Sequence, residues 1–119
     1  MAKILITDDS MFMRMSLKTM LLAEGYEVCE AANGKEMLAV YDVEMPDVVT
    51  LDITMPEMDG QEALKRLKQK HPKAKVIMCS AMGQQVMVME AIKSGAVNFL
   101  VKPFEKSKVL DTICKALNM

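Results

Sequence analysis

Short apolar runs, several of them rich in β-branched residues, alternate along the chain with longer segments in which apolar residues recur every three to four positions. The short apolar runs are typical of buried strands, and apolar residues spaced three to four positions apart are typical of helices that cover a sheet. The pattern predicts strands over residues 3–7, 26–31, 47–52, 75–80 and 97–101. It predicts helices over residues 11–24 and 35–44, from about 59 to 70, and over 84–94 and 105–117.

The ends of these helices carry capping and stop signals. Ser10 is the expected N-cap of the first helix, and Gly25 and Gly95 end the first and fourth. The pair His71-Pro72 ends the third. The positions that share the inward spacing are Met13, Leu17, Met20, Leu21 and Glu24 in the first helix, Met37, Leu38 and Tyr41 in the second, Ala63, Leu64 and Leu67 in the third, Val88, Ala91 and Ile92 in the fourth, and Val109, Leu110, Ile113 and Leu117 in the fifth.

Five strands that alternate with five helices predict an α/β fold, with a parallel sheet covered by helices on both faces. Right-handed crossovers make this a doubly wound (βα)5 sandwich. In such sheets, ligands bind beyond the carboxyl ends of the strands, where the strand order reverses. The 119 residues suffice for one such unit, so residues 1–119 are expected to form a single domain.

Composition and charge narrow the function classes. A net charge of −1 gives no reason to expect binding to nucleic acid or to a membrane, and no apolar stretch is long enough to span a bilayer. The chain starts directly with a strand pattern, which leaves no room for a signal peptide and favours a cytoplasmic protein. Cys29, Cys79 and Cys114 fit neither a disulfide framework nor a zinc motif, so they are expected to be reduced and buried.

Polar residues follow four of the five predicted strands at the point where each ends. Asp8 and Asp9 follow the first strand, and Asp52, Ser80 and Lys102 end or follow the third, fourth and fifth. All five would emerge at the same edge of a parallel sheet. Three carboxylates repel one another unless a positive charge lies between them. Together with a hydroxyl and an ammonium, they predict a pocket for a divalent metal and a phosphoryl group. Oxygen ligands favour Mg²⁺, with Mn²⁺ as the alternative.

Taken singly, these residues have ordinary structural interpretations. Asp8 or Asp9 could cap the following helix, Ser80 could belong to a turn, and Lys102 could be a surface lysine. The Lys102-Pro103 bond could be cis, which would direct the lysine inward. It is the set of strand-end positions, rather than any one of them, that indicates a site.

Three segments of the chain resemble receiver domains of two-component response regulators: residues 4–10 (Ile-Leu-Ile-Thr-Asp-Asp-Ser), 52–60 (Asp-Ile-Thr-Met-Pro-Glu-Met-Asp-Gly) and 102–104 (Lys-Pro-Phe). The resemblance extends over the whole chain. Residues 12–15 and 79–85 are similar to the stand-alone chemotaxis members, the CheY-like group, of Gram-positive bacteria, thermophiles and archaea. The resemblance implies a flavodoxin-like strand order of 2-1-3-4-5.

The resemblance also implies roles for the residues at the strand ends. Asp52 would be the phosphoacceptor, which receives a phosphoryl group from a CheA-like histidine kinase. The side chains of Asp9 and Asp52 and the backbone carbonyl of Thr54 would bind Mg²⁺, and Asp8 would act through a bound water. Lys102 would pair with the phosphoryl oxygens. Such a protein is a switch that promotes its own phosphorylation and dephosphorylation rather than an enzyme.

A switch and a partner surface are implied in the same way. Ser80 would turn towards the phosphate, and Phe99 would rotate into the space that Ser80 leaves. Many relatives have Thr in place of Ser80 and Tyr in place of Phe99. The partner would be a flagellar motor switch protein or an archaeal motility adaptor, a phosphatase could also bind, and the protein would be a monomer. The expected surface consists of Gln85, Met89, Lys93, Phe99, Val101 and Lys106.

Three alternatives share parts of this pattern. A haloacid-dehalogenase-type phosphohydrolase also uses an aspartate, Mg²⁺ and a lysine, but it usually has a second Asp two residues after the first, where this chain has Thr54. A flavodoxin-like cofactor carrier would need a Ser/Thr/Gly-rich loop after the first strand. A pseudo-receiver would bind a partner without being phosphorylated, and the complete set of site residues argues against it.

Overall fold

Strands and helices alternate strictly in the computed structural model, which describes residues 1–119. The strands are β1 (Lys3–Thr7), β2 (Glu27–Ala31), β3 (Val48–Asp52), β4 (Val76–Ser80) and β5 (Asn98–Val101). The helices are α1 (Met11–Ala23), α2 (Gly34–Glu44), α3 (Gly60–Lys70), α4 (Gln85–Lys93) and α5 (Lys106–Leu117). Every predicted element is present, and its ends lie within one residue of the prediction.

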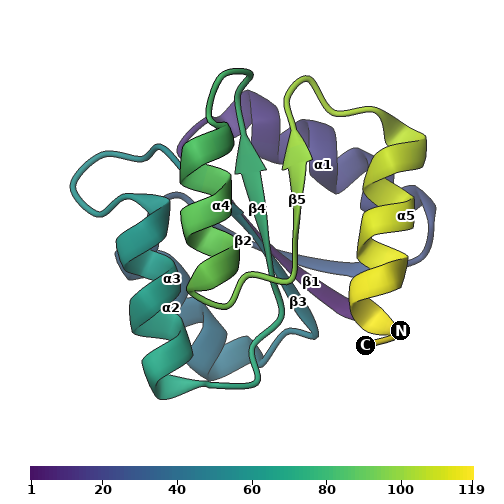
Figure 1. The fold of residues 1–119 in the computed structure, drawn as a ribbon. Coiled ribbons are helices and arrows are strands. Elements are labelled where there is room, and N and C mark those ends of the chain that lie inside the picture. The colour runs from purple at the N-terminus through teal and green to yellow at the C-terminus, as the bar shows by residue number, and fades with distance from the viewer.

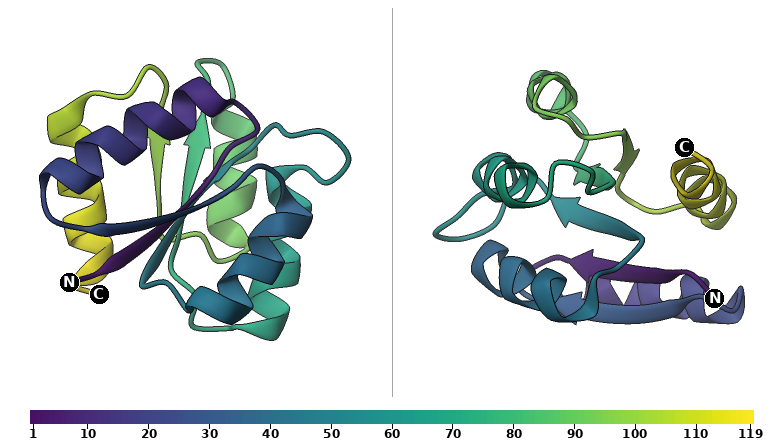
Figure 2. Two further views of the ribbon diagram at one scale, coloured as in Figure 1. Left: turned by 180° about the vertical axis from the view of Figure 1, so that it is seen from behind. Right: turned by 90° about the horizontal axis from the view of Figure 1, so that it is seen from below.

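All five strands are parallel and follow the order β2-β1-β3-β4-β5, which confirms the doubly wound fold and the strand order implied by the resemblance. Helices α1 and α5 cover one face of the sheet, and α2, α3 and α4 cover the other (Figures 1 and 2). The chain moves from β1 to β2 on one side and then back to β3 on the other. The strand order therefore reverses between β1 and β3, whose carboxyl ends carry Asp8, Asp9 and Asp52.

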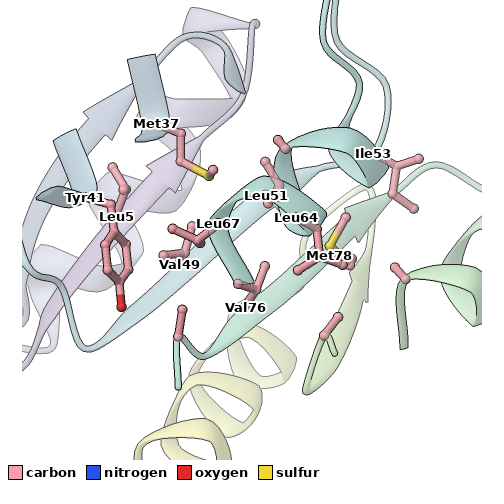
Figure 3. Close-up of a cluster of buried hydrophobic side chains, with 14 of the residues drawn as sticks. Leu5, Met37, Tyr41, Val49, Leu51, Ile53, Leu64, Leu67, Val76 and Met78 are labelled. Atoms are coloured by element: carbon pink, nitrogen blue, oxygen red, sulfur yellow. The ribbon is translucent and has the colours of Figure 1, made fainter. Parts of the chain in front are cut away.

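The alternation of side chains along each strand divides the core into two clusters. Leu5, Val49 and Leu51 face α2 and α3, where they join Leu64 and Leu67 (Figure 3). Their neighbours in the sequence point to the opposite face, towards α1 and α5. Full burial of one such leucine contributes roughly 1.5–3 kcal/mol, so both faces stabilise the sheet. The members of the second cluster are Ile4, Ile6, Leu17, Leu21, Val48, Ile77, Cys79, Leu100, Val109, Ile113 and Ala116.

Side-chain caps fix the first turn of three helices. The backbone N–H of Met13 donates to Ser10 Oγ at 3.3 Å, as the sequence predicted. Asn33 and Asp59 cap α2 and α3 in the same way. Each cap satisfies an N–H group that has no partner within its own helix. Since α1 starts three residues after Asp8, its cap also limits the movement of the loop that carries the first two carboxylates.

Three expectations about orientation are wrong. Glu24 is exposed because it is the C-cap of α1, where the last turn leaves the sheet. Ile92 is 43% exposed because α4 buries only the narrow stripe that contains Val88 and Ala91. Cys114 is exposed because it follows the buried Ile113 and lies on the outer side of α5. None of the helices has the length and apolar character needed to cross a membrane.

Gly60 brings the start of α3 directly against the backbone that follows Asp52. Its N–H donates to the Ile53 carbonyl at 2.7 Å. A Cβ atom at this position would meet the carbonyl oxygen of Asp52 and the Cα atom of Ile53, which are backbone atoms that cannot turn away. A side chain here would therefore push α3 away from the site.

We expect Gly60→Ala to lower the free energy of unfolding by roughly 1–2 kcal/mol, because overpacking against backbone forces a shift of the helix. Urea unfolding would measure the loss. Gly83→Ala is a poor control because its φ is +88°, so Ala39→Ser on the exposed side of α2 is the better match. A Gly60→Ala protein as stable as wild type would contradict this prediction, because it would show that α3 can shift without lowering the free energy of unfolding.

Candidate functional site

Three carboxylates meet at the carboxyl ends of β1 and β3. Asp8 and Asp52 are buried, whereas Asp9 is exposed. One ligand oxygen from each lies within 4.8 Å of the others. Oxygen atoms at this spacing are suited to a hard divalent cation, and the exposed side of the cluster leaves room for water ligands. The strand-end prediction thus places these three residues together, as the structure does.

Lys102 supplies the only cation in contact with this cluster. Its Nζ atom lies 3.0 Å from Asp8 Oδ2 and 3.3 Å from Asp52 Oδ1, and the side chain is 22% exposed. The backbone N–H of Lys102 donates to the Ser80 carbonyl at 2.8 Å, and the Lys102-Pro103 bond is cis. The two Nζ distances show that the lysine side chain is directed inward, between two buried carboxylates.

The surroundings of Asp52 and Lys102 shift the pKa of both side chains. Burial and the nearby charge of Asp8 raise the pKa of Asp52 to about 6, although Lys102 opposes this shift. Burial alone would lower the pKa of Lys102, but its hydrogen bond to Asp8 and the negative charges of Asp52 and Asp8 outweigh burial and raise it. At neutral pH Asp52 is therefore mostly ionised and Lys102 is protonated, so the three carboxylates face a single positive charge.

Ser80 and Phe99 lie on the side of the site that faces α4. Ser80 is buried, and its hydroxyl donates to the Leu100 carbonyl at a long 3.5 Å. No hydrogen bond joins it to the three carboxylates. Phe99 is 44% exposed, and it lines the same cavity of about 480 Å³ as Ser80, Val88 and Val101. The serine hydroxyl is therefore not hydrogen-bonded to the acidic cluster, and Ser80 and Phe99 line the same cavity.

The residues expected to form a partner surface are all exposed. They come from α4, β5 and the start of α5, and in Figure 1 β5 lies between the two helices. Met89 is among the most exposed apolar residues of this surface, together with Met82 and Val86, which had not been predicted. A stretch of α4 with so many exposed apolar side chains is typical of a surface that binds another protein. The six predicted residues are Gln85, Met89, Lys93, Phe99, Val101 and Lys106.

Gln84 connects two loops of the site, and the sequence contained no signal for it. Its Oε1 atom accepts a hydrogen bond from the Ala81 N–H at 2.7 Å, and its Nε2 atom donates to Thr54 Oγ1 at 2.9 Å. The loop after β3 is thus joined to the loop after β4. Such a contact depends on tertiary structure, because Gln84 and Thr54 are far apart in the chain and neither belongs to a motif with the other.

Comparisons with known proteins agree with this geometry. The family model for the response regulator receiver domain matches residues 4–114. Chemotaxis protein CheY of Listeria monocytogenes is 57% identical over 117 residues, which cover 98% of each chain, and that of Thermotoga maritima is 54% identical over 114 residues, or 95% of each. The crystal structure of the receiver domain of NtrX from Brucella abortus has a TM-score of 0.95 at 31% identity and covers 98% of both chains. The chain therefore belongs to the response regulator receiver domain family.

Proposed function

We propose that this chain is a chemotaxis response regulator in which Asp52 accepts a phosphoryl group from a histidine kinase, and that phosphorylation changes a partner-binding surface. The observation that carries the proposal is the contact of Lys102 Nζ with Asp52 Oδ1 at 3.3 Å, beside the cluster of three carboxylates. A buried nucleophile, a cation and a place for a metal are the parts that phosphoryl transfer requires. Membership of the receiver family implies a histidine kinase as the phosphodonor.

The oxygen atoms of the acidic cluster fit a magnesium ion. Mg²⁺ prefers oxygen ligands and keeps several of its waters, and the exposed position of Asp9 allows both. The side chains of Asp9 and Asp52 and the backbone carbonyl of Thr54 would hold the ion, and Asp8 would act through a water. Mn²⁺ would suit the same ligands. When bound, the ion supplies positive charge next to the phosphoryl oxygens.

Asp52 is the nucleophile of the proposed transfer. Its carboxylate forms a bond to phosphorus while the bond from phosphorus to the imidazole nitrogen of the donor breaks, and the electron pair of that bond stays on the nitrogen. Because the pKa of Asp52 is about 6, the carboxylate is ionised at neutral pH and needs no general base. Before the transfer the Lys102 ammonium pairs with the Asp52 carboxylate, and during the transfer it pairs with the phosphoryl oxygens, where negative charge develops.

The proposed switch uses the weakly held hydroxyl of Ser80. Its hydrogen bond to Leu100 is long, so little is lost when the hydroxyl turns to donate to a phosphoryl oxygen. Phe99 would then enter the cavity that it shares with Ser80 and change the surface of α4, β5 and α5. The partner would be a motor switch protein or an archaeal motility adaptor in the cytoplasm, and a phosphatase would reset the switch.

Intact mass spectrometry after incubation with acetyl phosphate, with and without Mg²⁺, tests this function. We expect wild type to gain one phosphoryl group only when Mg²⁺ is present, and Asp52→Asn to gain none. Asp111→Asn is the matched control, because Asp111 is an exposed aspartate on the outer side of α5 and should leave the adduct intact.

Two outcomes would contradict the proposal. An adduct that persists in Asp52→Asn would place the acceptor elsewhere. Steady release of phosphate without any adduct would instead indicate a phosphohydrolase. The surroundings of Thr54 do not favour a hydrolase, because its exposed hydroxyl accepts a hydrogen bond from Gln84 where a hydrolase would have a second aspartate.

A further inference from the structure

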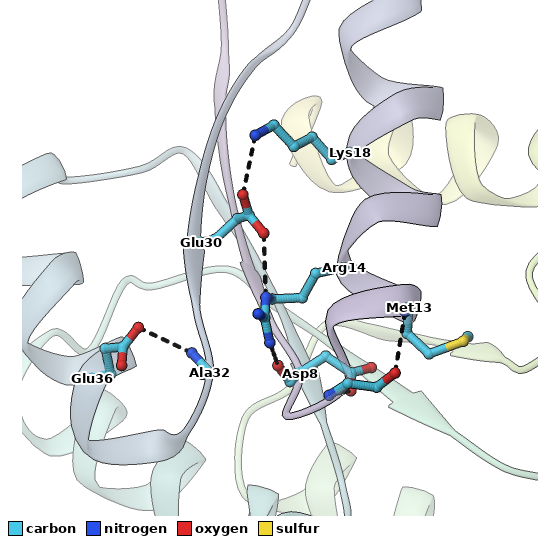
Figure 4. A network of polar contacts seen from close by, with 8 residues as sticks. Asp8, Met13, Arg14, Lys18, Glu30, Ala32 and Glu36 are labelled. Carbon is cyan, nitrogen blue, oxygen red and sulfur yellow. Dashed lines mark hydrogen bonds and ion pairs between the residues drawn. The ribbon is translucent and has the colours of Figure 1, made fainter.

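Two ion pairs between α1 and β2 and a hydrogen bond to the backbone of the acidic loop form one connected network (Figure 4). The Nη1 atom of Arg14 donates to the main-chain carbonyl of Asp8 at 2.5 Å, and Nε of the same guanidinium donates to Glu30 Oε1 at 3.2 Å. The other oxygen of Glu30 accepts from Lys18 Nζ at 3.1 Å. The side chain of Arg14 is only 14% exposed. Arg14 and Glu30 together are called the Arg14 clamp below.

The position of Asp9 depends on its backbone. Asp8 is fixed through its side chain, because Oδ1 accepts from the Ser10 N–H at 2.9 Å and Oδ2 contacts Lys102. None of the hydrogen bonds or ion pairs in the structure involves the carboxylate of Asp9. The carbonyl that Arg14 holds belongs to the planar peptide group that also contains the nitrogen of Asp9. Holding that oxygen fixes the plane that also contains the Cα atom of Asp9, and so restricts the directions in which the Asp9 side chain can extend.

We infer that Arg14 is a positioning residue, which acts through the Asp8 carbonyl to hold the Asp9 carboxylate where it can bind the metal. This inference rests on the proposed function, because it concerns the metal-binding step of that same site. No atom of Arg14 contacts the carboxylates themselves in the hydrogen bonds and ion pairs of the structure. Its role is to reduce the number of orientations available to the ligand before the metal arrives.

The geometry requires an arginine rather than any cation. A guanidinium carries several N–H groups in one rigid plane, so Arg14 donates to the Asp8 carbonyl and to Glu30 at the same time. A lysine has one ammonium on a flexible stem and would not hold both partners in the same fixed geometry. Glu30 is the second necessary part, because it neutralises the poorly exposed guanidinium and prevents it from turning towards solvent.

The β2 strand supports the same loop at a second point. The backbone N–H of Asp8 donates to the Ala31 carbonyl at 3.2 Å, directly after the residue that binds Arg14. Both ends of the Asp8 backbone are thus anchored to residues 30 and 31. Lys18, which is 42% exposed and contacts only the outer oxygen of Glu30, contributes little to this arrangement.

Isothermal titration of the unphosphorylated protein with Mg²⁺ tests the inference. We expect Arg14→Lys to weaken Mg²⁺ binding by roughly tenfold, since loss of a residue that orients a metal ligand typically costs 10–100-fold in affinity. The rate of phosphorylation by acetyl phosphate should fall in the same proportion at low Mg²⁺ and return close to the wild-type rate at saturating Mg²⁺. Lys18→Gln is the matched control, because it removes a neighbouring charge and leaves the clamp intact.

A second variant tests the other half of the Arg14 clamp. Glu30→Gln keeps an oxygen that accepts a hydrogen bond from Arg14 but removes the charge, so it should weaken Mg²⁺ binding by a smaller factor than Arg14→Lys. Thermal unfolding in EDTA identifies any variant that is not folded. Equal Mg²⁺ affinities in wild type and in either folded clamp variant would overturn the inference. So would a loss in Lys18→Gln as large as that in Arg14→Lys. Wild type that binds Mg²⁺ but is never phosphorylated would contradict the proposed function instead.

Discussion

Replacing Lys102 with methionine will lower the free energy of unfolding of the metal-free protein by about 2–3 kcal/mol and slow the phosphorylation of Asp52 by roughly a hundredfold. Methionine retains most of the volume of the stem but removes the charge that lies between Asp8 and Asp52. Two buried carboxylates then face each other without a cation. The loss of stability stays below that of a fully buried ion pair because Lys102 is 22% exposed and Asp52 can take up a proton.

The slower phosphorylation has a separate cause. Lys102 is the side chain that meets the charge developing on the phosphoryl oxygens, and loss of one such donor typically reduces a rate by a factor of 10²–10³. Urea unfolding in EDTA and the rate of adduct formation with acetyl phosphate would measure the two effects. Lys108→Met, at an exposed position of α5 that makes no ion pair, should change neither. Unchanged stability in Lys102→Met would mean that solvent already screens the two carboxylates.

Asp52→Asn will stabilise the metal-free protein at neutral pH, and this advantage will disappear in acid. The ordinary pKa of an aspartate is 3.8, and in the folded protein that of Asp52 is about 6. Above pH 6 the carboxylate is charged in both states, and the folded state bears the cost of burying that charge next to Asp8. Between about pH 6 and 4 the folded state binds a proton that the unfolded chain does not. The contribution of Asp52 to wild-type stability therefore rises as the pH falls through this window.

The size of the effect follows from the same two values. The difference between 3.8 and about 6 corresponds to roughly 3 kcal/mol. The value of about 6 already includes the opposing attraction of Lys102, so a difference of roughly 3 kcal/mol is the upper bound expected at pH 7.5. Urea unfolding in EDTA at pH 7.5 and pH 4 would show a large difference between the variant and wild type at the higher pH only. A difference that is the same at both pH values would refute the prediction, and Asp111→Asn should stay within about 0.5 kcal/mol throughout.

Periodicity and strand-end positions were sufficient to predict the elements and to bring the acidic residues together. Asp8, Asp9 and Asp52 could be placed because any residue at the end of a parallel strand lies at a known edge of the sheet. The inward face of α4 was harder, because Ile92 has the same spacing as a buried residue and only the position of the helix over the sheet shows that it is exposed.

Contacts made by long polar side chains could not be predicted from the sequence. Arg14 and Glu30 are separated by most of α1 and the turn that follows it, and their pairing depends on the distance between α1 and β2. The hydrogen bond of the Ser80 hydroxyl to the Leu100 carbonyl could not be predicted either, since the choice among side-chain rotamers depends on neighbours that no pattern specifies. The roles of these residues in phosphorylation and switching stay predictions.

The two sides of the pocket differ in how firmly they are held. Asp8 has four anchors, namely Ser10, Arg14, Lys102 and the carbonyl of Ala31, whereas the hydroxyl of Ser80 has a single long hydrogen bond. Substitutions around β1 and α1 should therefore alter the rate at which Asp52 is phosphorylated. Substitutions around β4 and β5 should alter how strongly a partner responds. Natural selection can thus adjust the rate of phosphorylation and the strength of the partner's response independently, within one small domain.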